Sequence, residues 1–467
     1  MGIISGRCVR LLPHAAADIM SWKYQCKRMD GGYYLLTEGV QVPVRIFMTE
    51  RLFNQSEEGV FAQIVAATRF PGVTEVVVTP DAHTGYVVPV GCVMATTGTL
   101  CQAPVGYDIG CGMMAFRSEV DLGRGKDQTL RQRFSEEVMR SIGLGVGQGG
   151  RSKFNPNRFQ SVIRQGAVAL GYQRESTERE FIPVDDNWDP PATAVHRGIG
   201  QLGSLGGGNH FCELQHDQNG KLWVMVHTGS RGFGHALATH YIQAGKKYLQ
   251  EKKVDVRGGA EAVYFEPDAP LYRDYKNAIA AGANFAIANR LLIWEAVGKA
   301  FKKVFGKEPE LVYEISHNLA QEEITASGEV RWVHRKGATR AFPAGHPMLK
   351  GTRWEETGHP ILIPGSMGDT SYILYASEGA ANSLYSVNHG CGRLHSRGAC
   401  KDLFTQSGVR KLMKGLDVMV NAGGHIPIDE SPGAYKPAKD VIQAVLDADL
   451  ATVAYKLTPL ASIKGVD

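Results

Sequence analysis

The sequence predicts an α+β protein in which mixed or largely antiparallel β-sheets are flanked by helices. Apolar runs typical of strands occur early and late in the chain and do not alternate regularly with helices, which argues against a wound parallel sheet. One stretch, residues 272–305, has apolar residues at a helical period. With 467 residues, 43% of them hydrophobic, the chain can bury a large core. We expect a single large domain over residues 1–467, although this length also permits up to about three smaller domains.

The N-terminal part of the chain is expected to mix short strands with helices. The runs VPVRIFM (42–48) and TEVVVTP (74–80) predict strands because they are rich in β-branched residues. Helices are predicted around residues 59–68 and near residues 130–142. The segment VDDNWDPPATA (184–194) predicts a loop.

A long helix is predicted in the middle of the chain, and strands return after it. The helix would pack one apolar stripe on the core, formed by Ile287, Leu291, Trp294, Val297, Phe301 and Val304. Trp294 is therefore expected in the core rather than in a base-stacking site. Later strands are predicted at ELVYEIS (310–316), EVRWVHR (329–335), HPILIPG (359–365) and SYILYA (371–376). Two helical patterns, residues 440–446 and 449–457, are expected near the end.

Charge and cysteine content limit the possible partners and compartments. The formal net charge is +4, from 51 basic and 47 acidic residues, which is too small to indicate a nucleic-acid partner. A local basic cluster could contact phosphates or form a solvated loop, and it comprises Arg331, His334, Arg335, Lys336 and Arg340. The eight cysteines have no paired spacing that predicts disulfides. No signal peptide or membrane-spanning run is evident, so we expect a cytoplasmic protein that contacts no membrane.

Residues of the types that bind metals follow several of the predicted strands. Asp108 and Cys111 lie three residues apart in PVGYDIGCGMMAF, where Gly110 and Gly112 allow a tight turn. Three histidines each end an apolar stretch, and these are His210, His227 and His317. A lone cysteine or histidine is usually structural, but their joint occurrence in glycine-rich motifs is not typical of a core. One carboxylate, one thiolate and three imidazoles suit a borderline divalent transition ion, or two ions that share the thiolate, better than magnesium.

The remaining cysteines lack such neighbours. We expect Cys92, Cys101, Cys212 and Cys400 to be ordinary buried or free thiols.

The segment SVNHGCGRLHSR (386–397) presents a histidine suited to attack phosphorus. His389 stands between small residues, so Gly390 and Gly392 leave room for a phosphate ester. Arg393 offers a planar fork of donors to phosphate oxygens. A histidine flanked by glycines can also have a purely structural role in a tight turn, and the segment by itself does not decide between the two.

Taken in order, the motifs resemble those of the RNA-splicing ligase RtcB family, which joins RNA ends. They run from about Pro80 to Lys464 and are PDAHTGY, DIGC, GGGNHFCE, HTGSRG, SHN, HRKGATRAFPAG, PGSMGDTSY, HGCGR and PLASIKG. Three positions depart from the usual family pattern. Cys391 stands where a small residue is common, Val87 stands where a glycine is usual, and Asp369 replaces a residue that is more often neutral. Asp369 is expected to add negative charge near the nucleotide.

The resemblance implies an RtcB-like fold and an RNA ligase that uses GTP and two manganese ions. One ion would be bound by Cys111, His227 and His317, and the second by Asp108, Cys111 and His210. His389 would attack the α-phosphorus of GTP and carry GMP. Metal-activated water would open a 2′,3′-cyclic phosphate to a 3′-phosphate, which would accept the guanylyl group. The 5′-hydroxyl of the other RNA end would then displace GMP.

The same resemblance assigns the contacts to the nucleotide and to RNA. Glu213 would accept protons from guanine, Phe211 and Tyr435 would form the walls, and Asn209 would contact the ribose or a phosphate. Further nucleotide contacts are expected from Ser366, Met367, Ser371, Gly390, Cys391, Gly392, Arg393 and Lys464. RNA phosphates are expected to contact Arg231, Lys336 and Arg340.

Two other functions remain open at this point. The chain could be a metal-dependent RNA cyclic phosphodiesterase or phosphatase that does not join ends, or an RNA-binding homologue without ligase activity. The intact HGCGR segment and Glu213 favour the ligase, because neither alternative needs a guanylylated histidine. The family's substrates include tRNA exons and cleaved repair substrates, and the sequence does not choose between them. We expect a monomer, and the need for an activating protein partner stays open.

Overall fold

The chain crosses from one large β-sheet to another at His317. This residue separates β13 (Glu310–Ser316), an edge strand of one sheet, from β14 (Asn318–Ile324), an edge strand of the other. The structure is a computed structural model that describes residues 22–150, 154–172, 183–254 and 262–465. Residues 1–21 lie outside the described residues. They include most of the N-terminal segment for which the sequence predicts no signal peptide.

The first sheet has seven strands and mostly antiparallel pairing. In spatial order they are β1 (Lys27–Arg28), β2 (Tyr34–Leu36), β3 (Val44–Ile46), β4 (Val73–His83), β5 (Val90–Thr96), β15 (Val330–Lys336) and β14. The β3–β4 pair is parallel. The central strands are buried and rich in valine, as their β-branched composition predicts.

The second sheet has eight strands and contributes most of the candidate site. In spatial order they are β13, β7 (Gly112–Asp121), β11 (Lys221–Thr228), β10 (Phe211–His216), β21 (Ala451–Lys464), β18 (Ser371–Ala376) and β17 (Pro360–Ile363), with β20 (Met419–Val420) beside β21. Short pairs complete the strands: β6 (Leu100–Cys101) with β12 (Tyr264–Phe265), β8 (Gly143–Leu144) with β9 (Ser204–Gly206), and β16 (Ala338–Arg340) with β19 (Ser386–Asn388).

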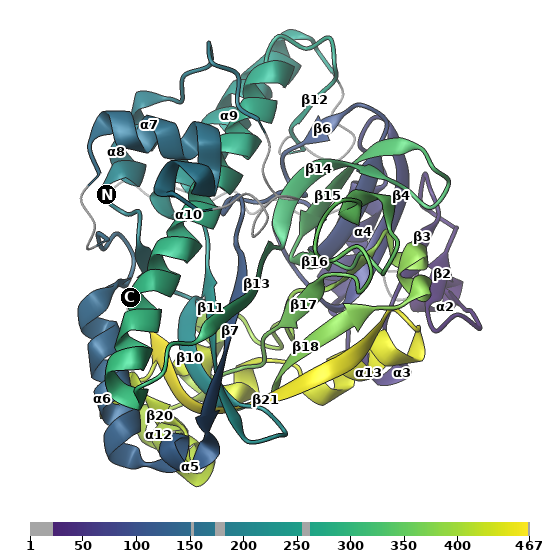
Figure 1. Cartoon of the computed structure of the whole chain (residues 1–467). Coiled ribbons are helices and arrows are strands. Elements are labelled where there is room, and N and C mark those ends of the chain that lie inside the picture. Colours follow the sequence, from purple (N-terminus) through teal and green to yellow (C-terminus); the bar gives the residue numbers. More distant parts are fainter. Residues whose placement is uncertain (1–21, 151–153, 173–182, 255–261, 466–467) are drawn as a thin grey trace, which may run out of the picture.

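Helices gather mainly on one side of the second sheet, around the long helix α10 (Tyr272–Phe305), as Figure 1 shows. α10 contacts α6 (Gln128–Ser141), α7 (Pro156–Gln165) and α9 (Arg231–Glu251). It ends at Gly306, whose φ of 81° suits glycine at a helix C-terminus. Among the described residues, the other α-helices are α2 (Trp22–Gln25), α3 (Glu50–Asn54), α4 (Glu58–Ala67), α5 (Leu122–Lys126), α8 (Ala192–Ile199), α11 (Arg397–Leu403), α12 (Gln406–Gly415) and α13 (Ala438–Asp447). None of the described helices is both long and apolar enough to span a membrane.

The predicted α+β class with mixed sheets is confirmed, and so are the helices predicted around residues 59–68, 130–142, 272–305 and 440–446. Trp294, on α10, is half-buried and packs against a cluster of buried core residues. The predicted loop at residues 184–194 ends early, because α8 begins at Ala192.

The helix predicted over residues 449–457 is wrong, because this segment lies in β21. Thr452, Val453 and Tyr455 favour an extended chain, and Pro459 cannot continue a helix. The strand pairs with both β10 and β18. The apolar spacing that suggested a helix was therefore overridden by sheet pairing.

Candidate active site

The five predicted metal ligands gather at one end of neighbouring strands in the second sheet. Cys111 precedes β7, His210 precedes β10, His227 lies near the end of β11 and His317 follows β13, while Asp108 lies in the turn before Cys111. The strand register accounts for this, because His227 pairs with Phe211 and Thr228 pairs with Gly112. Ser316 also pairs with Gly112. Residues that are far apart in sequence thus meet at one sheet edge.

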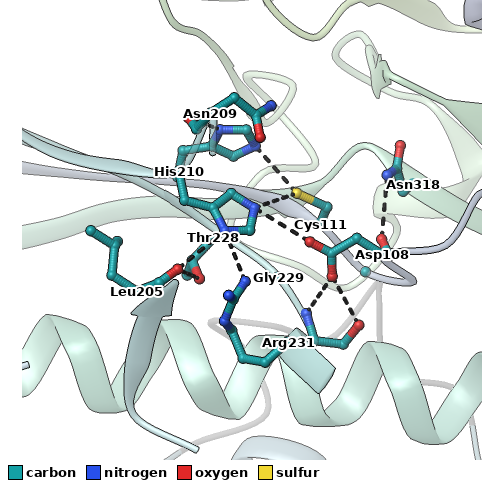
Figure 2. Close-up of polar contacts among 12 residues, drawn as sticks. Asp108, Cys111, Leu205, Asn209, His210, Thr228, Gly229, Arg231 and Asn318 are labelled. Atoms are coloured by element: carbon teal, nitrogen blue, oxygen red, sulfur yellow. Dashed lines mark hydrogen bonds and ion pairs between the residues drawn. The ribbon is translucent and has the colours of Figure 1, made fainter. Parts of the chain in front are cut away.

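Two overlapping groups of possible ligand atoms result, Cys111 with His227 and His317, and Cys111 with Asp108 and His210. Within each group the atoms lie within 4.8 Å of one another. The Cys111 Sγ lies 3.3 Å from Nε2 of His210 and 3.2 Å from Nε2 of His227. Figure 2 shows His210 and Asp108 beside the Cys111 sulfur. Cys111 belongs to both groups, so its sulfur is the atom that could bridge two ions.

The histidines are oriented as metal ligands usually are. Nδ1 of His227 lies 3.1 Å from the carbonyl oxygen of Asn209, and Nδ1 of His210 lies 3.1 Å from that of Leu205. A carbonyl can only accept, so each Nδ1 in such a bond carries the proton and Nε2 presents a lone pair. Burial holds the pKa values of His227 and His317 well below the usual range, which keeps both rings neutral. Nδ1 of His317 is buried and has no hydrogen-bond partner among the described residues.

Burial also raises the pKa of the Cys111 thiol well above its usual value, and the nearby Asp108 carboxylate adds to this effect. A bound divalent cation would stabilise the thiolate and reverse the shift. The donor set therefore fits one or two transition ions better than it fits an empty core.

A buried arginine from α10 positions the turn that carries Cys111. Arg290 forms a fully buried ion pair with Glu314, with Nε 2.6 Å from Oε2, and donates to the carbonyl of Gly110 at 2.7 Å. The turn lies so close to its neighbours that a Cβ on Gly110 would approach Ala286 to 2.8 Å, and one on Gly112 would approach the Ile315 oxygen to 2.2 Å. Glycine is therefore required at both positions.

Asp108 and Arg231 lie on the side of the cluster that faces α9. Ser230 donates to Oδ1 of Asp108 from its backbone N–H (2.9 Å) and from its hydroxyl (3.1 Å). Although burial alone would raise the pKa of Asp108, His210 and Arg231 hold it well below its usual range. Nη1 of Arg231 lies 2.8 Å from Nδ1 of His210 (Figure 2). Nδ1 of His210 cannot donate to the Leu205 carbonyl and accept from Arg231 at the same time. An ion at Nε2 would keep the proton on Nδ1, and the Arg231 guanidinium would then be available to an anion.

Gly206 makes space for Arg231. A Cβ at this position would lie 1.6 Å from Nη2 of Arg231. The Nε of Arg231 is buried without a hydrogen-bond partner among the described residues. Both observations suit a guanidinium that binds an anionic group.

His389 follows β19 and lies beside the metal-ligand cluster. Its ring centroid is 4.7 Å from that of His317. Its Nδ1 lies 2.6 Å from Oδ2 of Asp81, a buried carboxylate near the end of β4. Burial alone would raise the pKa of Asp81, but His389 and a 2.6 Å hydrogen bond from Thr79 lower it overall. The Asp81 carboxylate lies in ion-pair contact with Nδ1, an arrangement that favours the tautomer with the lone pair on Nε2.

A cavity beside His389 is lined by most of the residues predicted to bind the nucleotide. These are Asn209, Phe211, Glu213, Ser366, Met367, Gly390, Cys391, Gly392, Arg393, Tyr435 and Lys464, and His83, His227, Pro364, Gly365, Arg397 and Glu430 complete the lining. Burial raises the pKa of Glu213 to about 8, although a hydrogen bond from Gln215 and the charge of Lys464 oppose the rise. Gln215 donates to Oε2 of Glu213 at 2.7 Å.

Glu430, whose role the sequence did not predict, holds the basic side chains of the cavity wall. Its carboxylate lies 3.2 Å from Nζ of Lys464, 3.2 Å from Nη1 of Arg393 and 2.9 Å from Nη1 of Arg397. The hydroxyl of Tyr435 donates to it at 2.7 Å. Burial alone would raise the pKa of Glu430, but these cations lower it overall. Arg393 is therefore a wall residue whose fork is largely used by the protein.

Four of the residues predicted to contact the nucleotide or RNA lie outside this cavity lining. Ser371 is buried behind the wall, where its hydroxyl contacts Gln215 (2.9 Å) and the N–H of Gly365 (3.0 Å). Lys336 and Arg340 are buried, and Lys336 donates to the carbonyls of Tyr86 and Val88. Arg231 faces the metal-ligand cluster instead.

Asp369 does not line the cavity, but its charge reaches the lining, because burial raises the pKa of the Cys391 thiol and the Asp369 carboxylate adds to the rise. Its carboxylate accepts from the N–H groups of Thr370 and Ala438, each at 2.8 Å. Ala438 is the first residue of α13, and the N-cap residue, Pro437, has no side chain that could cap the helix. Asp369 therefore caps α13, which explains a carboxylate at this position.

Sequence reasoning missed Asp81, His83, Arg290, Arg397 and Glu430 as residues that build the site. Asp81 and His83 lie in the PDAHTGY motif and could have been found, because an aspartate beside a nucleophilic histidine is a common arrangement. Arg397 ends the SVNHGCGRLHSR segment and could have been found from that segment as well. Arg290 and Glu430 carry no local signal, because their partners are distant in sequence.

Comparison with known proteins agrees with this arrangement. The family model described as tRNA-splicing ligase RtcB matches residues 63–465. A tRNA-splicing ligase RtcB from Thermococcus kodakarensis is 33% identical, covering 91% of this chain and 95% of the relative. One from Pyrobaculum aerophilum is 34% identical with the same coverage, and RNA-splicing ligase RtcB homolog 1 from Entamoeba dispar is 31% identical, covering 92% and 88%. The chain therefore belongs to the RtcB family of tRNA-splicing ligases.

Proposed function

We propose that the protein is a GTP- and manganese-dependent RNA ligase that joins 2′,3′-cyclic-phosphate or 3′-phosphate ends to 5′-hydroxyl ends. The main support is the pairing of His389 with Asp81 at 2.6 Å in the cavity that Glu213 also lines. An imidazole that is held by an ionised carboxylate and open to a polar cavity suits a nucleophile better than a core residue.

In the first step, Nε2 of His389 attacks the α-phosphorus of GTP. A P–N bond forms, the bond to the bridging oxygen breaks, and pyrophosphate leaves. The proton on Nδ1 stays with the ring, and Asp81 stabilises the positive charge that the imidazole acquires. The cavity residues Gly390 and Gly392 leave room for the phosphate, because neither has a side chain.

In the second and third steps, the guanylyl group moves to RNA and is then displaced. A 3′-phosphate oxygen attacks the phosphorus on His389, so the P–N bond breaks and an RNA 3′-diphosphoguanosine end forms. The 5′-hydroxyl of the second RNA attacks the RNA phosphorus, and GMP leaves. Arg231, freed from His210 as described above, is suited to hold an RNA phosphate near this point.

Two groups of residues would hold the ions: Cys111 with His227 and His317, and Cys111 with Asp108 and His210. Bound manganese would neutralise charge on the triphosphate and on the transition state.

Glu213 is suited to select guanine. A buried carboxylate can accept both the N1 and N2 protons of guanine, and adenine offers neither in the same places. Phe211 and Tyr435 also line this cavity and can supply flat walls for a base.

The direct test is to incubate the protein with α-labelled GTP and manganese and to look for an acid-labile protein label. We expect labelling of the wild type and none of His389→Ala, with metal content and unfolding temperature unchanged in the variant. A labelled His389→Ala protein would refute the nucleophile. Opening of a 2′,3′-cyclic phosphate without any protein label would favour the phosphodiesterase instead.

A further inference from the structure

Three aromatic rings lie in a row beside the candidate metal cluster and have no part in the function proposed so far. The ring centroids of Tyr86 and Tyr107 are 5.5 Å apart, and those of Tyr107 and His235 are 5.2 Å apart. The second pair is stacked, with 25° between the planes. Tyr86 and Tyr107 are half-buried and His235 is exposed. We call these three residues the aromatic row.

The aromatic row leads outward from the second group of ligands. Tyr107 directly precedes Asp108 in the chain. His235 lies four residues after Arg231 on α9, so the two side chains share one face of the helix. Because Arg231 contacts His210, the row extends from the place where phosphates would be handled towards solvent.

The loop that carries Tyr86 is held in a costly conformation. Val87 has a φ of 60°, which a β-branched residue rarely adopts. Two sets of side-chain hydrogen bonds hold this loop. Lys336 donates to the carbonyls of Tyr86 (2.7 Å) and Val88 (2.9 Å), and Gln63 bonds to both the N–H and the carbonyl of Gly85, at 2.8 and 2.6 Å. Such over-determined strain is typical of functional loops rather than of passive turns.

We propose that the aromatic row is a stacking platform for a base at or next to the end of a single-stranded RNA. This inference rests on the proposed ligase function, because that function brings RNA ends to the neighbouring cluster. Every base has a flat π-face, so stacking holds a strand without reading its sequence, which suits an enzyme that joins ends. Partial exposure of the rings leaves edges and faces accessible to such a base.

The test compares RNA binding with and without the terminal base, with GTP omitted so that guanylylation is not required. Short single strands carry either 2-aminopurine or an abasic residue at the terminal nucleotide, and 3′-phosphate and 5′-hydroxyl ends are tested separately. For wild type we expect quenching of 2-aminopurine and an affinity at least about fivefold higher than for abasic RNA, for one of the two ends.

Variants then assign the effect to the rings. His235→Ala and Tyr86→Leu should lower the affinity for base-containing RNA towards the abasic level, while Tyr86→Phe, which keeps a ring, should behave as wild type. His240→Ala is the matched control, because His240 is exposed on the same helix but makes an edge-on contact with Tyr241 instead. Binding of abasic RNA should be equal in all of these proteins.

The outcomes separate this proposal from the ligase proposal. If wild type and the variants show the same ratio of base-containing to abasic affinity, or if wild type shows no base-dependent binding at either end, the platform is refuted. Labelling by GTP is measured in parallel and should be normal in His235→Ala. Base-dependent binding in a protein that GTP does not label would refute the nucleotide step alone.

Discussion

The candidate metal cluster and the neighbouring cavity both contain buried polar side chains, but their charges are balanced differently. In the cavity wall each cation has a carboxylate partner within the protein, because Glu430 pairs with Lys464, Arg393 and Arg397. The metal-ligand cluster is not balanced by ion pairs in this way. Burial disfavours the Cys111 thiolate, and the buried histidines around it are neutral.

This difference indicates which parts of the site are complete before ligands arrive. The cavity wall is preformed by ion pairs and needs no further charge to be stable. The cluster needs an external cation before its sulfur can ionise. Substitutions in the cluster should therefore act through metal content, and substitutions in the cavity should act through nucleotide binding or folding.

A substitution of Asp81 is the strongest test of this separation between the metal-ligand cluster and the cavity. Asp81 contacts His389 and belongs to neither group of residues. Asp81→Asn should slow guanylylation by about 10²–10⁴-fold, because an amide cannot stabilise the positive imidazole or impose the same tautomer. Metal content, measured by elemental analysis, should not change. Thr79→Val removes the hydroxyl that donates to Asp81 and also contacts the Gly91 carbonyl, and should cost about tenfold or less. A loss of manganese in Asp81→Asn would contradict the separation of the metal-ligand cluster from the cavity.

On the cluster side, we expect Cys111→Ser to lose manganese far more severely than Asp108→Asn. A serine hydroxyl does not readily ionise to bridge two ions at neutral pH, whereas loss of Asp108 removes a ligand from only one group. The difference in apparent affinity should be about tenfold or more. Calorimetric titration with manganese would measure it, and equal occupancy in the two variants would argue against bridging.

On the cavity side, Glu430→Gln should act on stability before ligands are added. Removing the charge leaves Lys464 and Arg393 without their main carboxylate partner in a buried site, which should cost about 3–5 kcal/mol of unfolding free energy. Denaturant unfolding of metal-free protein would show this. Manganese affinity should stay within about twofold of wild type.

The same contrast explains how much of the site was visible in the sequence. The five candidate ligands were singled out from the sequence because each adjoins an apolar stretch and most lie in glycine-rich motifs, and strand ends meet at one edge. Glu430 and Arg290 were not, because they act through partners from distant segments that no local pattern connects. The fold shows a similar limit. The long helix follows from its periodicity, but residues 449–457 had a helical spacing that the pairing of residues 451–457 with β18 overrides.

Lys336 and Arg393 illustrate a second limit. Both are basic residues in suggestive motifs, and charge alone indicates phosphate binding. In the fold, carbonyl oxygens surround Lys336, and Glu430 and Tyr435 engage Arg393. A sequence reports which donors exist but not whether the protein itself already uses them.

A smaller effect is expected when the base-reading carboxylate is changed. Glu213→Gln replaces an acceptor by a mixed group and leaves a donor facing the donors of guanine, which should cost about 1–3 kcal/mol. ATP has an acceptor at N1 and no amine at C2, so the glutamine can serve it at least as well as GTP. We therefore expect the GTP preference in His389 labelling to collapse. An unchanged GTP:ATP ratio would mean that Glu213 does not read the base.

The smallest expected effect is a pH dependence of GTP affinity that arises from Glu213 in the cavity. Burial raises the pKa of Glu213 to about 8, so at pH 7 the free protein holds a proton that must leave before the carboxylate can accept from guanine. GTP affinity should therefore rise with pH, by about eightfold between pH 7 and pH 8.5 if this group alone titrates. The rise has this sign because the neutral acid is the form that cannot accept both protons. Glu213→Gln should remove this component, so the two proteins are compared by titrating a non-hydrolysable GTP analogue at each pH. A parallel rise in the variant would place the titration on the nucleotide or on the metal ligands, and would show that the cavity and the cluster are not independent.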